Sequence, residues 1–191
     1  MQQHNQVAPG DLEEVRRFIN TWSIPNQTRV ETDVLPMLVK DAHAWARELS
    51  LYPRQPADNL DMLSTLRLAL RQACADHAQH PEALNAVFGG VPLQARVQPN
   101  DGVMRLQLES TQGTYAGHIL AIVANAIAAG HFSRLKTCGD CQWAFYDHTR
   151  SGNKRWCGMT KGGPQGRACG TIAKVSAFRQ RAAMKARAAD T

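Results

Sequence analysis

Apolar positions recur at helical spacing over most of the first 130 residues. Acidic residues at 11–14 predict the start of a helix, whose apolar stripe runs from Val15 through Ile19 to Trp22. Residues 30–35 are expected to form a connecting loop. Further helices are predicted over 38–49, 60–78, 81–87 and 114–129, the last being strongly apolar and closed by Gly130.

Strict alternation of apolar and polar residues replaces the helical spacing between Leu93 and Leu108. Two alternating runs, 93–97 and 103–108, flank an Asn100-Asp101-Gly102 turn, which predicts a β-hairpin. Since an isolated hairpin is marginally stable, we expect it to lie against the helices. The predicted fold class is mainly α with one hairpin, that is α+β, with a helical N-terminal domain over 1–130 and a small C-terminal module over 131–191.

Charge divides the chain in the same way. Residues 1–130 carry ten Lys and Arg against thirteen Asp and Glu, whereas residues 131–191 carry twelve against three. The second part therefore has a charge of +9, which favours a polyanionic partner. No apolar run approaches the roughly 20 residues that span a bilayer, and the first residues do not resemble a secretory signal. We expect a cytoplasmic protein that does not enter membranes.

Four of the five cysteines fall in the basic part, as Cys138-x-x-Cys141, Cys157 and Cys169. A Cys-x-x-Cys turn completed by a second pair is typical of a structural zinc site, and reduced cysteines are the rule inside cells. The fifth, Cys74, lies on the apolar stripe of the predicted 60–78 helix and is expected to be a buried, inert thiol.

Two alternatives remain for this cluster. His131 or His148 could replace Cys169, because a shell of three cysteines and one histidine is also common. The Cys138–Cys141 pair could instead be a redox pair, although such pairs usually lie in a βαβ unit and this one does not. A closed four-cysteine shell leaves no position for water, so we expect one structural Zn²⁺ and no metal catalysis.

Three C-terminal segments together form a recognisable motif. They are Cys138-Gly-Asp-Cys141-Gln-Trp143-Ala-Phe145-Tyr-Asp147, Arg155-Trp156-Cys157-Gly-Met159, and Cys169-Gly170 with Ala173-Lys174. This motif resembles the CGNR zinc finger family. In that family the finger follows a helical domain called ABATE, and the N-terminal pattern is similar to it. The resemblance implies a transcription regulator, in some members linked to stress.

Two features depart from the family pattern. The Asn and Arg of Cys-Gly-Asn-Arg are replaced by Thr171 and Ile172, and residues 160–168 lengthen the gap before Cys169. If the family Arg contacts phosphate, Arg167 or Lys174 would have to substitute for it. A predicted helix over 171–189 follows, with basic residues along one side and a second line of apolar residues.

The resulting hypothesis is a zinc-binding transcriptional regulator that is not an enzyme and whose basic module binds nucleic acid, with DNA as the expected partner. The candidate metal ligands are Cys138, Cys141, Cys157 and Cys169. The candidate phosphate contacts are Arg150, Lys154, Arg155, Lys174, Arg181 and Lys185. Trp143, Phe145 and Trp156 are expected to form a small core around the metal. The alternative is a zinc-stabilised protein-interaction module with a ligand-sensing helical domain, and a homodimer and a small-molecule signal are both compatible with either.

Overall fold

The computed structural model describes residues 6–77, 81–100, 102–159 and 168–189, and of Asn100 and residues 185–189 only the main chain. Its helices are α1 (Leu12–Ile19), α2 (Leu35–Lys40), α3 (Ala42–Glu48), α4 (Leu60–Ala75), α5 (Pro81–Gly89), α6 (Tyr115–Ala128), the 3₁₀ helix η2 (Phe132–Arg134) and α7 (Cys169–Ala189). Its antiparallel strand pairs are β1 (Trp22–Ser23) with β2 (Thr32–Asp33), β3 (Leu93–Asn100) with β4 (Val103–Ser110), and β5 (Leu135–Thr137) with β6 (Ala144–Tyr146). The predicted α+β class is confirmed, and two short strand pairs accompany the predicted hairpin.

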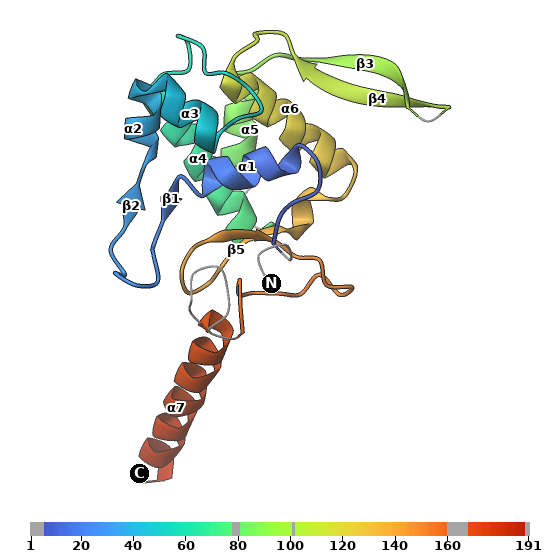
Figure 1. The fold of residues 1–191 in the computed structure, drawn as a ribbon. Helices are drawn as coiled ribbons and strands as arrows, with labels where there is room; N and C mark the ends of the chain where they lie inside the picture. Colours follow the sequence, from blue (N-terminus) through green and yellow to red (C-terminus); the bar gives the residue numbers. More distant parts are fainter. Residues whose placement is uncertain (1–5, 78–80, 101, 160–167, 190–191) are drawn as a thin grey trace.

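Helices α1 to α6 pack into a body, below which the β5–β6 segment lies, and α7 leaves that segment as a separate rod (Figure 1). Tyr115, at the start of α6, is fully buried at the centre of the body. Its ring meets Phe18 and Trp45 edge-on, with centroids 5.5 and 4.7 Å apart. Such edge contacts suit the quadrupoles of aromatic rings, so α1, α3 and α6 share one core.

The predicted helix over 38–49 is wrong as a single element. Asp41 is extended, with φ −124° and ψ 104°, and its carboxylate accepts hydrogen bonds from the main-chain N–H groups of His43 and Ala44. It therefore ends α2 and caps α3. Trp45 and Leu49 are buried as expected. Ala42 is exposed, because the break at Asp41 changes the faces on which the flanking residues lie.

The residues predicted to extend or connect helices at 20–35 instead form the β1–β2 pair. Trp22 belongs to β1 rather than to α1, which ends at Ile19. Trp22 pairs with Asp33, within the segment that was expected to be a loop. The Arg67 side chain holds this pair from α4, through hydrogen bonds of 2.7 and 2.6 Å to the two carboxylate oxygens of Asp33.

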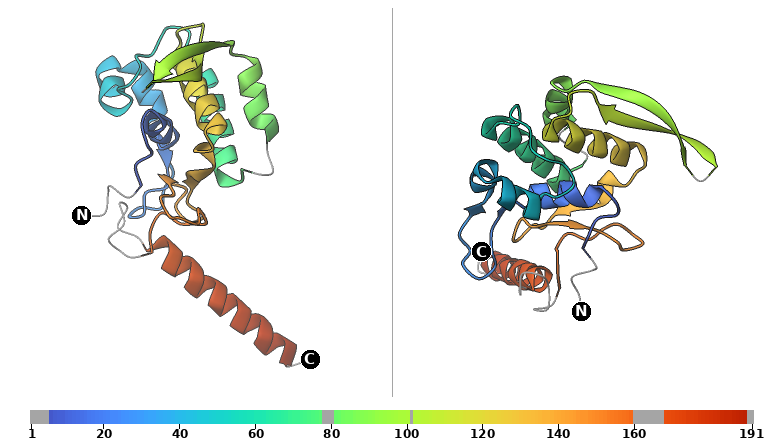
Figure 2. Two further views of the ribbon diagram at one scale, coloured as in Figure 1. Left: turned by 90° about the vertical axis from the view of Figure 1, so that its right-hand side faces the viewer. Right: turned by 45° about the horizontal axis from the view of Figure 1, so that its top comes forward.

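The β3–β4 hairpin forms where the alternation predicted it, and its register places Val97 opposite Leu106. Its base is fixed to α6 by the side-chain amide of Asn125, which both donates to and accepts from the main chain of Leu108 at 2.9 Å. The hairpin thus lies against a helix at its base, as expected, but its far half projects from the body (Figure 2). Val97, Met104 and Leu106 there are 63–73% exposed.

The β5–β6 segment is joined to the helical body by a continuous core. Leu135, Ala144 and Tyr146 belong to the same buried cluster as the side chains of α1, α4 and α6. The side chain of Asn20, just after α1, accepts from the Ala144 N–H at 2.7 Å and donates to its carbonyl at 3.0 Å. The strands that flank Cys138 and Cys141 are therefore positioned in part by the end of α1, more than 100 residues away in sequence.

Candidate metal centre

The structure brings Cys138, Cys141, Cys157 and Cys169 together, with all four Sγ atoms within 4.8 Å of one another. All four side chains are buried, and none forms a disulfide. The Sγ atoms of Cys141 and Cys157 lie 3.5 Å apart, and those of Cys157 and Cys169 lie 3.8 Å apart. These separations are far longer than an S–S bond of about 2.0 Å.

The cysteine spacings match a tetrahedral zinc shell. Zn–S bonds of about 2.3 Å at tetrahedral angles place neighbouring sulfurs about 3.8 Å apart. Without a cation, four packed thiols cannot all ionise. Hydrogen bonds with Cys138 and Cys141, followed by burial, raise the pKa of Cys157, and burial followed by the charge of Cys138 raises the pKa of Cys169. The four cysteines can hold one zinc ion, whose positive charge would compensate the negative charges of the thiolates.

The first two ligands lie in a tight turn directly after β5. The Cys138 N–H donates to the Trp143 carbonyl at 2.9 Å, and the Cys138 carbonyl accepts from the Gln142 N–H at 2.9 Å. Gln142 has a φ of 60°, a left-handed conformation that a non-glycine residue seldom adopts. The Gln142 carbonyl accepts a 3.1 Å hydrogen bond from Arg71 of α4, so the body holds this strained turn in place.

The last ligand is the first residue of α7. A thiolate at this position is favoured by the positive end of the helix dipole. The next residue, Gly170, donates to the Gly158 carbonyl at 2.9 Å, and a Cβ there would lie 2.1 Å from the Met159 sulfur. The glycine of the signature thus allows the Cys157 segment to pack against the start of the helix.

The two replaced signature residues have defined positions. The Thr171 hydroxyl donates to the Met159 carbonyl at 2.6 Å, which fastens the Cys157 segment to α7. Ile172 is 38% exposed on the first turn of α7. The side chain at the family Arg position is therefore partly open to solvent. Arg167, the other residue considered as a replacement, lies outside the described residues.

Aromatic side chains pack around the cysteines. Phe145 is fully buried among them, and Trp143 and Trp156 are half-buried against the cluster. This arrangement supports the expectation of a small core around the metal. The Trp143 indole N–H is buried and has no hydrogen-bond partner among the described residues.

Three cations near the cysteine cluster, Lys136, Lys154 and Arg155, contact groups other than the sulfurs. Lys136 lies 3.4 Å from the Asp147 carboxylate and also donates to the Gly152 carbonyl. Lys154 lies over the Phe145 ring and Arg155 over the Trp156 ring, each at 5.6 Å from the ring centroid. The structure shows no hydrogen bond from these three cations to a sulfur within its described part.

Asp147 organises the loop that connects the two cysteine pairs, a role that sequence reasoning missed. It is fully buried, and it accepts hydrogen bonds from the Thr149 main chain and hydroxyl and from the Lys154 N–H. Burial alone would raise its pKa, but these hydrogen bonds and the Lys136 charge lower the pKa to about 2. The signal was present in the sequence, since Asp147 is part of the motif.

Neither candidate histidine lies with the cysteines. His148 is exposed, and its Nε2 lies 2.8 Å from the Val7 carbonyl. His131 follows α6 and lines a groove elsewhere on the body. The donor set that the structure assembles is therefore four thiols, with Cys169 among them. Cys74, by contrast, is buried in the helical core, and burial raises its pKa far above the usual range.

The six candidate phosphate contacts occupy the loop after Asp147 and the helix α7. Arg150 and Arg155 are exposed and Lys154 is half-buried in the loop, while Lys174 and Arg181 are exposed on α7. Lys185 is also on α7, and its side chain lies outside the described part. Figures 1 and 2 show α7 extending away from the body as a separate rod.

The comparisons with known proteins agree with this centre. The family model of the CGNR zinc finger matches residues 134–182, a range that contains all four clustered cysteines and the first two thirds of α7. A search of curated proteins finds no match to the chain. No helix in the described residues combines the length and the apolar character that crossing a membrane requires.

Proposed function

We propose that this chain is a DNA-binding regulator in which zinc organises the 134–182 module and the module presents α7 to a duplex. The observation that carries the proposal is the position of Cys169. This residue is both a member of the cysteine cluster and the first residue of α7. Bound zinc would therefore fix the direction in which the basic helix leaves the body.

The dimensions and charge of α7 suit a DNA groove. Its 21 residues correspond to about 30 Å of helix, and the major groove of B-DNA admits an α-helix. Lys174 and Arg181 are seven residues apart, so they lie on the same face, and the main chain of Lys185 continues that line. These residues would contact phosphates and provide affinity rather than sequence reading.

The loop beside the metal centre would add a second set of phosphate contacts. The Lys154 and Arg155 side chains lie over aromatic rings that pack around the cysteines, and this limits their conformational freedom before binding. Arg150 is exposed in the same loop, and its carbonyl accepts from Arg134 at 3.4 Å. The module has a large excess of positive charge for such a role.

We assign the helical body to regulation, as an ABATE-type domain that responds to a small-molecule signal. Its support is the resemblance of the N-terminal sequence pattern and the continuous core that links the body to β5 and β6, the strands that flank Cys138 and Cys141. A signal that alters the body would be transmitted through packed side chains to the module.

The test is fluorescence anisotropy of the zinc-loaded full chain with a 20-base-pair duplex of random sequence, over a series of salt concentrations. We expect affinity to fall steeply with salt. The double variant Lys174→Ala/Arg181→Ala should bind about tenfold more weakly, and the log–log salt slope should decrease by about 1.8. The matched control, Lys40→Ala/Arg47→Ala, removes the same charge from exposed positions on α2 and α3 and should bind normally.

An affinity that does not change with salt, or an equal loss in both double variants, would refute docking through α7. Lys154→Ala/Arg155→Ala tests the loop separately, with a smaller expected loss. Circular dichroism and zinc content of each variant show whether the module remains folded.

A second candidate function is the recognition of another protein. Phe178 and Met184 on α7 are 67% and 72% exposed, and such apolar side chains fit a protein partner better than a phosphate backbone. Ile172, an apolar residue at the family Arg position, also favours a protein partner. If no duplex binds at low salt, while Phe178→Ala abolishes capture of a protein partner, this second function replaces the first.

A further inference from the structure

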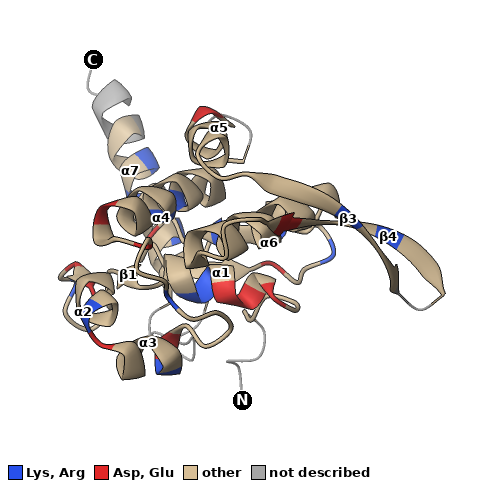
Figure 3. Cartoon of the chain, turned by 90° about the horizontal axis from the view of Figure 1, so that it is seen from above, with Lys and Arg blue, Asp and Glu red and all other residues tan. Residues whose placement is uncertain are grey.

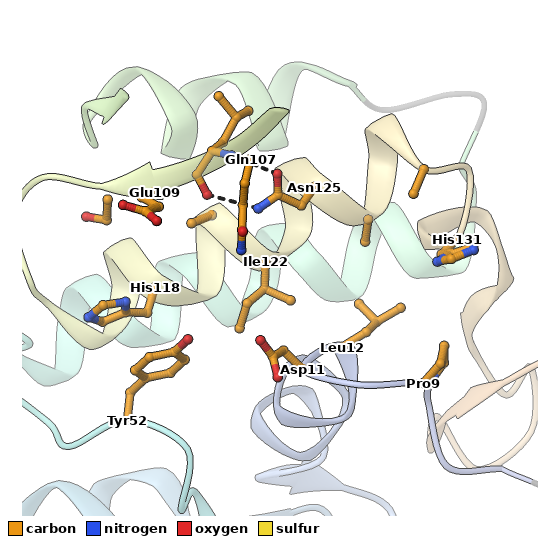
Figure 4. Close-up of a pocket in the computed structure, with 15 residues that line it drawn as sticks. Pro9, Asp11, Leu12, Tyr52, Gln107, Glu109, His118, Ile122, Asn125 and His131 are labelled. Carbon is orange, nitrogen blue, oxygen red and sulfur yellow. Dashed lines mark hydrogen bonds between the residues drawn. The ribbon is translucent and has the colours of Figure 1, made fainter. Parts of the chain in front are cut away.

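A groove of about 450 Å³ lies on the helical body, between α6, β4 and the start of α1 (Figure 4). Its apolar floor includes Leu12 of α1 and Ile122 of α6. The hydrogen bonds between Asn125 and Leu108 hold β4 at a fixed distance from α6, so the groove is part of the fold. A volume of this size is within the range of small-molecule sites.

Three polar groups at the groove have no hydrogen-bond partner in the described part of the chain. They are the Asp11 carboxylate, the Tyr52 hydroxyl and the His118 ring. The carboxylate can only accept hydrogen bonds, whereas the hydroxyl and a neutral imidazole can each accept one and donate one. The Tyr52 and His118 rings are stacked, with centroids 4.0 Å apart and planes 3° apart, which fixes both side chains. Figure 4 shows the Asp11 carboxylate and the Tyr52 hydroxyl directed into the same space.

The charge of the groove is negative, although the chain as a whole carries +6. Asp11 and Glu109 line it, and no Lys or Arg is among its described lining residues. Glu109 is already paired with Arg96 at 2.7 Å, so Asp11 is the carboxylate that is free to meet a ligand. Acidic residues gather at the start of α1 in Figure 3. Burial, followed by the charges of Asp11, Glu14 and Glu109, raises the pKa of Tyr52.

We propose that this groove binds a small organic cation. A carboxylate, a hydroxyl oxygen and a neutral imidazole nitrogen together accept several N–H donors, which a primary ammonium or an amidinium group supplies. The apolar part of the ligand would lie on Leu12 and Ile122. An anion would meet the Asp11 charge, and a neutral ligand would leave that carboxylate unpaired.

The groove also shares a segment of chain with the metal centre. Asp11 and Pro9 line the groove, and five residues before Asp11 the buried Gln6 donates from its amide to the Cys157 carbonyl. The main-chain carbonyl of Gln6 accepts a hydrogen bond from the Tyr146 N–H at 3.0 Å. A ligand in the groove would thus contact a segment that is attached to the zinc module. This placement agrees with the proposed sensing role, but the binding site itself does not depend on DNA binding.

The test is isothermal titration calorimetry of the zinc-loaded full chain with benzylamine and benzamidine, and with neutral benzyl alcohol and anionic benzoate of similar shape. We expect at least one of the two cations to bind saturably and at least tenfold more tightly than benzyl alcohol and benzoate. Asp11→Asn should weaken that binding at least tenfold. The matched control Glu31→Gln, an exposed acid outside the groove, should bind as the wild type does.

The Asp11 side chain forms no cap hydrogen bond to α1, so Asp11→Asn should keep the fold, which circular dichroism and zinc content can verify. Tyr52→Phe, which removes the hydroxyl and keeps the ring, should weaken binding severalfold and provides a second, independent variant. The proposal is overturned if neither cation binds at millimolar concentration, if benzoate or benzyl alcohol binds equally well, or if Asp11→Asn leaves the affinity unchanged.

Discussion

Replacing Asn20 tests the junction between the helical body and the strands β5 and β6, which flank Cys138 and Cys141. In Asn20→Ala the Ala144 carbonyl keeps the Arg16 guanidinium as a donor at 3.3 Å, but the Ala144 N–H loses its acceptor. Ala144 is fully buried, so its N–H would remain without a partner. An unsatisfied buried donor costs about 1–3 kcal/mol, and we expect a loss of about 2 kcal/mol.

The assay is thermal unfolding of the zinc-saturated protein followed by circular dichroism. For a chain of this size, about 2 kcal/mol corresponds to a decrease in Tm of about 4–8 °C. Asn153→Ala is the control, because Asn153 is exposed in the loop of the zinc module and its replacement should change stability by less than about 0.5 kcal/mol. A Tm for Asn20→Ala within 1 °C of the wild type would show that Asn20 does not hold β6 to the body.

Three other changes test separate parts of the structure. Burial raises the pKa of Glu14 above its usual value, so its contribution to stability is present below about pH 4.5 and is lost as pH rises through the native pKa. The free energy of unfolding of Glu14→Gln, relative to that of the wild type, should therefore be more favourable at pH 7 than at pH 5. Urea unfolding at both pH values measures this difference. Asp41→Ala removes the cap of α3 and should cost about 1 kcal/mol, whereas a gain in stability would contradict the capping role. Asp147→Asn should accelerate zinc release to a chelator, because the 147–154 loop loses the charge that pairs with Lys136; an unchanged rate would show that this loop does not support the metal site.

Sequence reasoning succeeded where the signal is local. The spacing of Leu63, Leu66 and Leu70 predicted α4, and all three are buried. The alternation around an Asn-Asp-Gly turn predicted the hairpin. The cysteine spacing predicted a cluster that the fold assembles. In each case the local structure is determined by a repeat of a few residues or by the spacing of the cysteines along the chain.

Sequence reasoning failed where distant residues decide the structure. The break at Asp41 depends on one side chain that caps the next helix, in a segment whose apolar spacing alone looks continuous. The short strands β1, β2, β5 and β6 have two or three residues each and exist because partners such as Asn20 and Arg67 hold them. Such contacts, across more than 30 positions, leave no periodic pattern in the sequence.

The ligands of the site and its aromatic neighbours could be predicted from the motif. The contacts of the nearby cations Lys136, Lys154 and Arg155 could not be predicted. Lys136 turns to the buried Asp147 rather than to the sulfurs, because a buried carboxylate requires a compensating charge. The acidic groove is formed by α1, α6 and β4, whose separate sequences give no indication that they meet.

The most direct test of the account is native mass spectrometry of the purified full chain, with and without single cysteine substitutions. The account predicts one zinc ion per chain in the wild type and in His148→Ala, and loss of that zinc in Cys141→Ser and Cys169→Ser. A wild-type chain without zinc, or a Cys169→Ser chain that retains zinc as tightly as the wild type, would contradict a metal centre formed by these four thiolates.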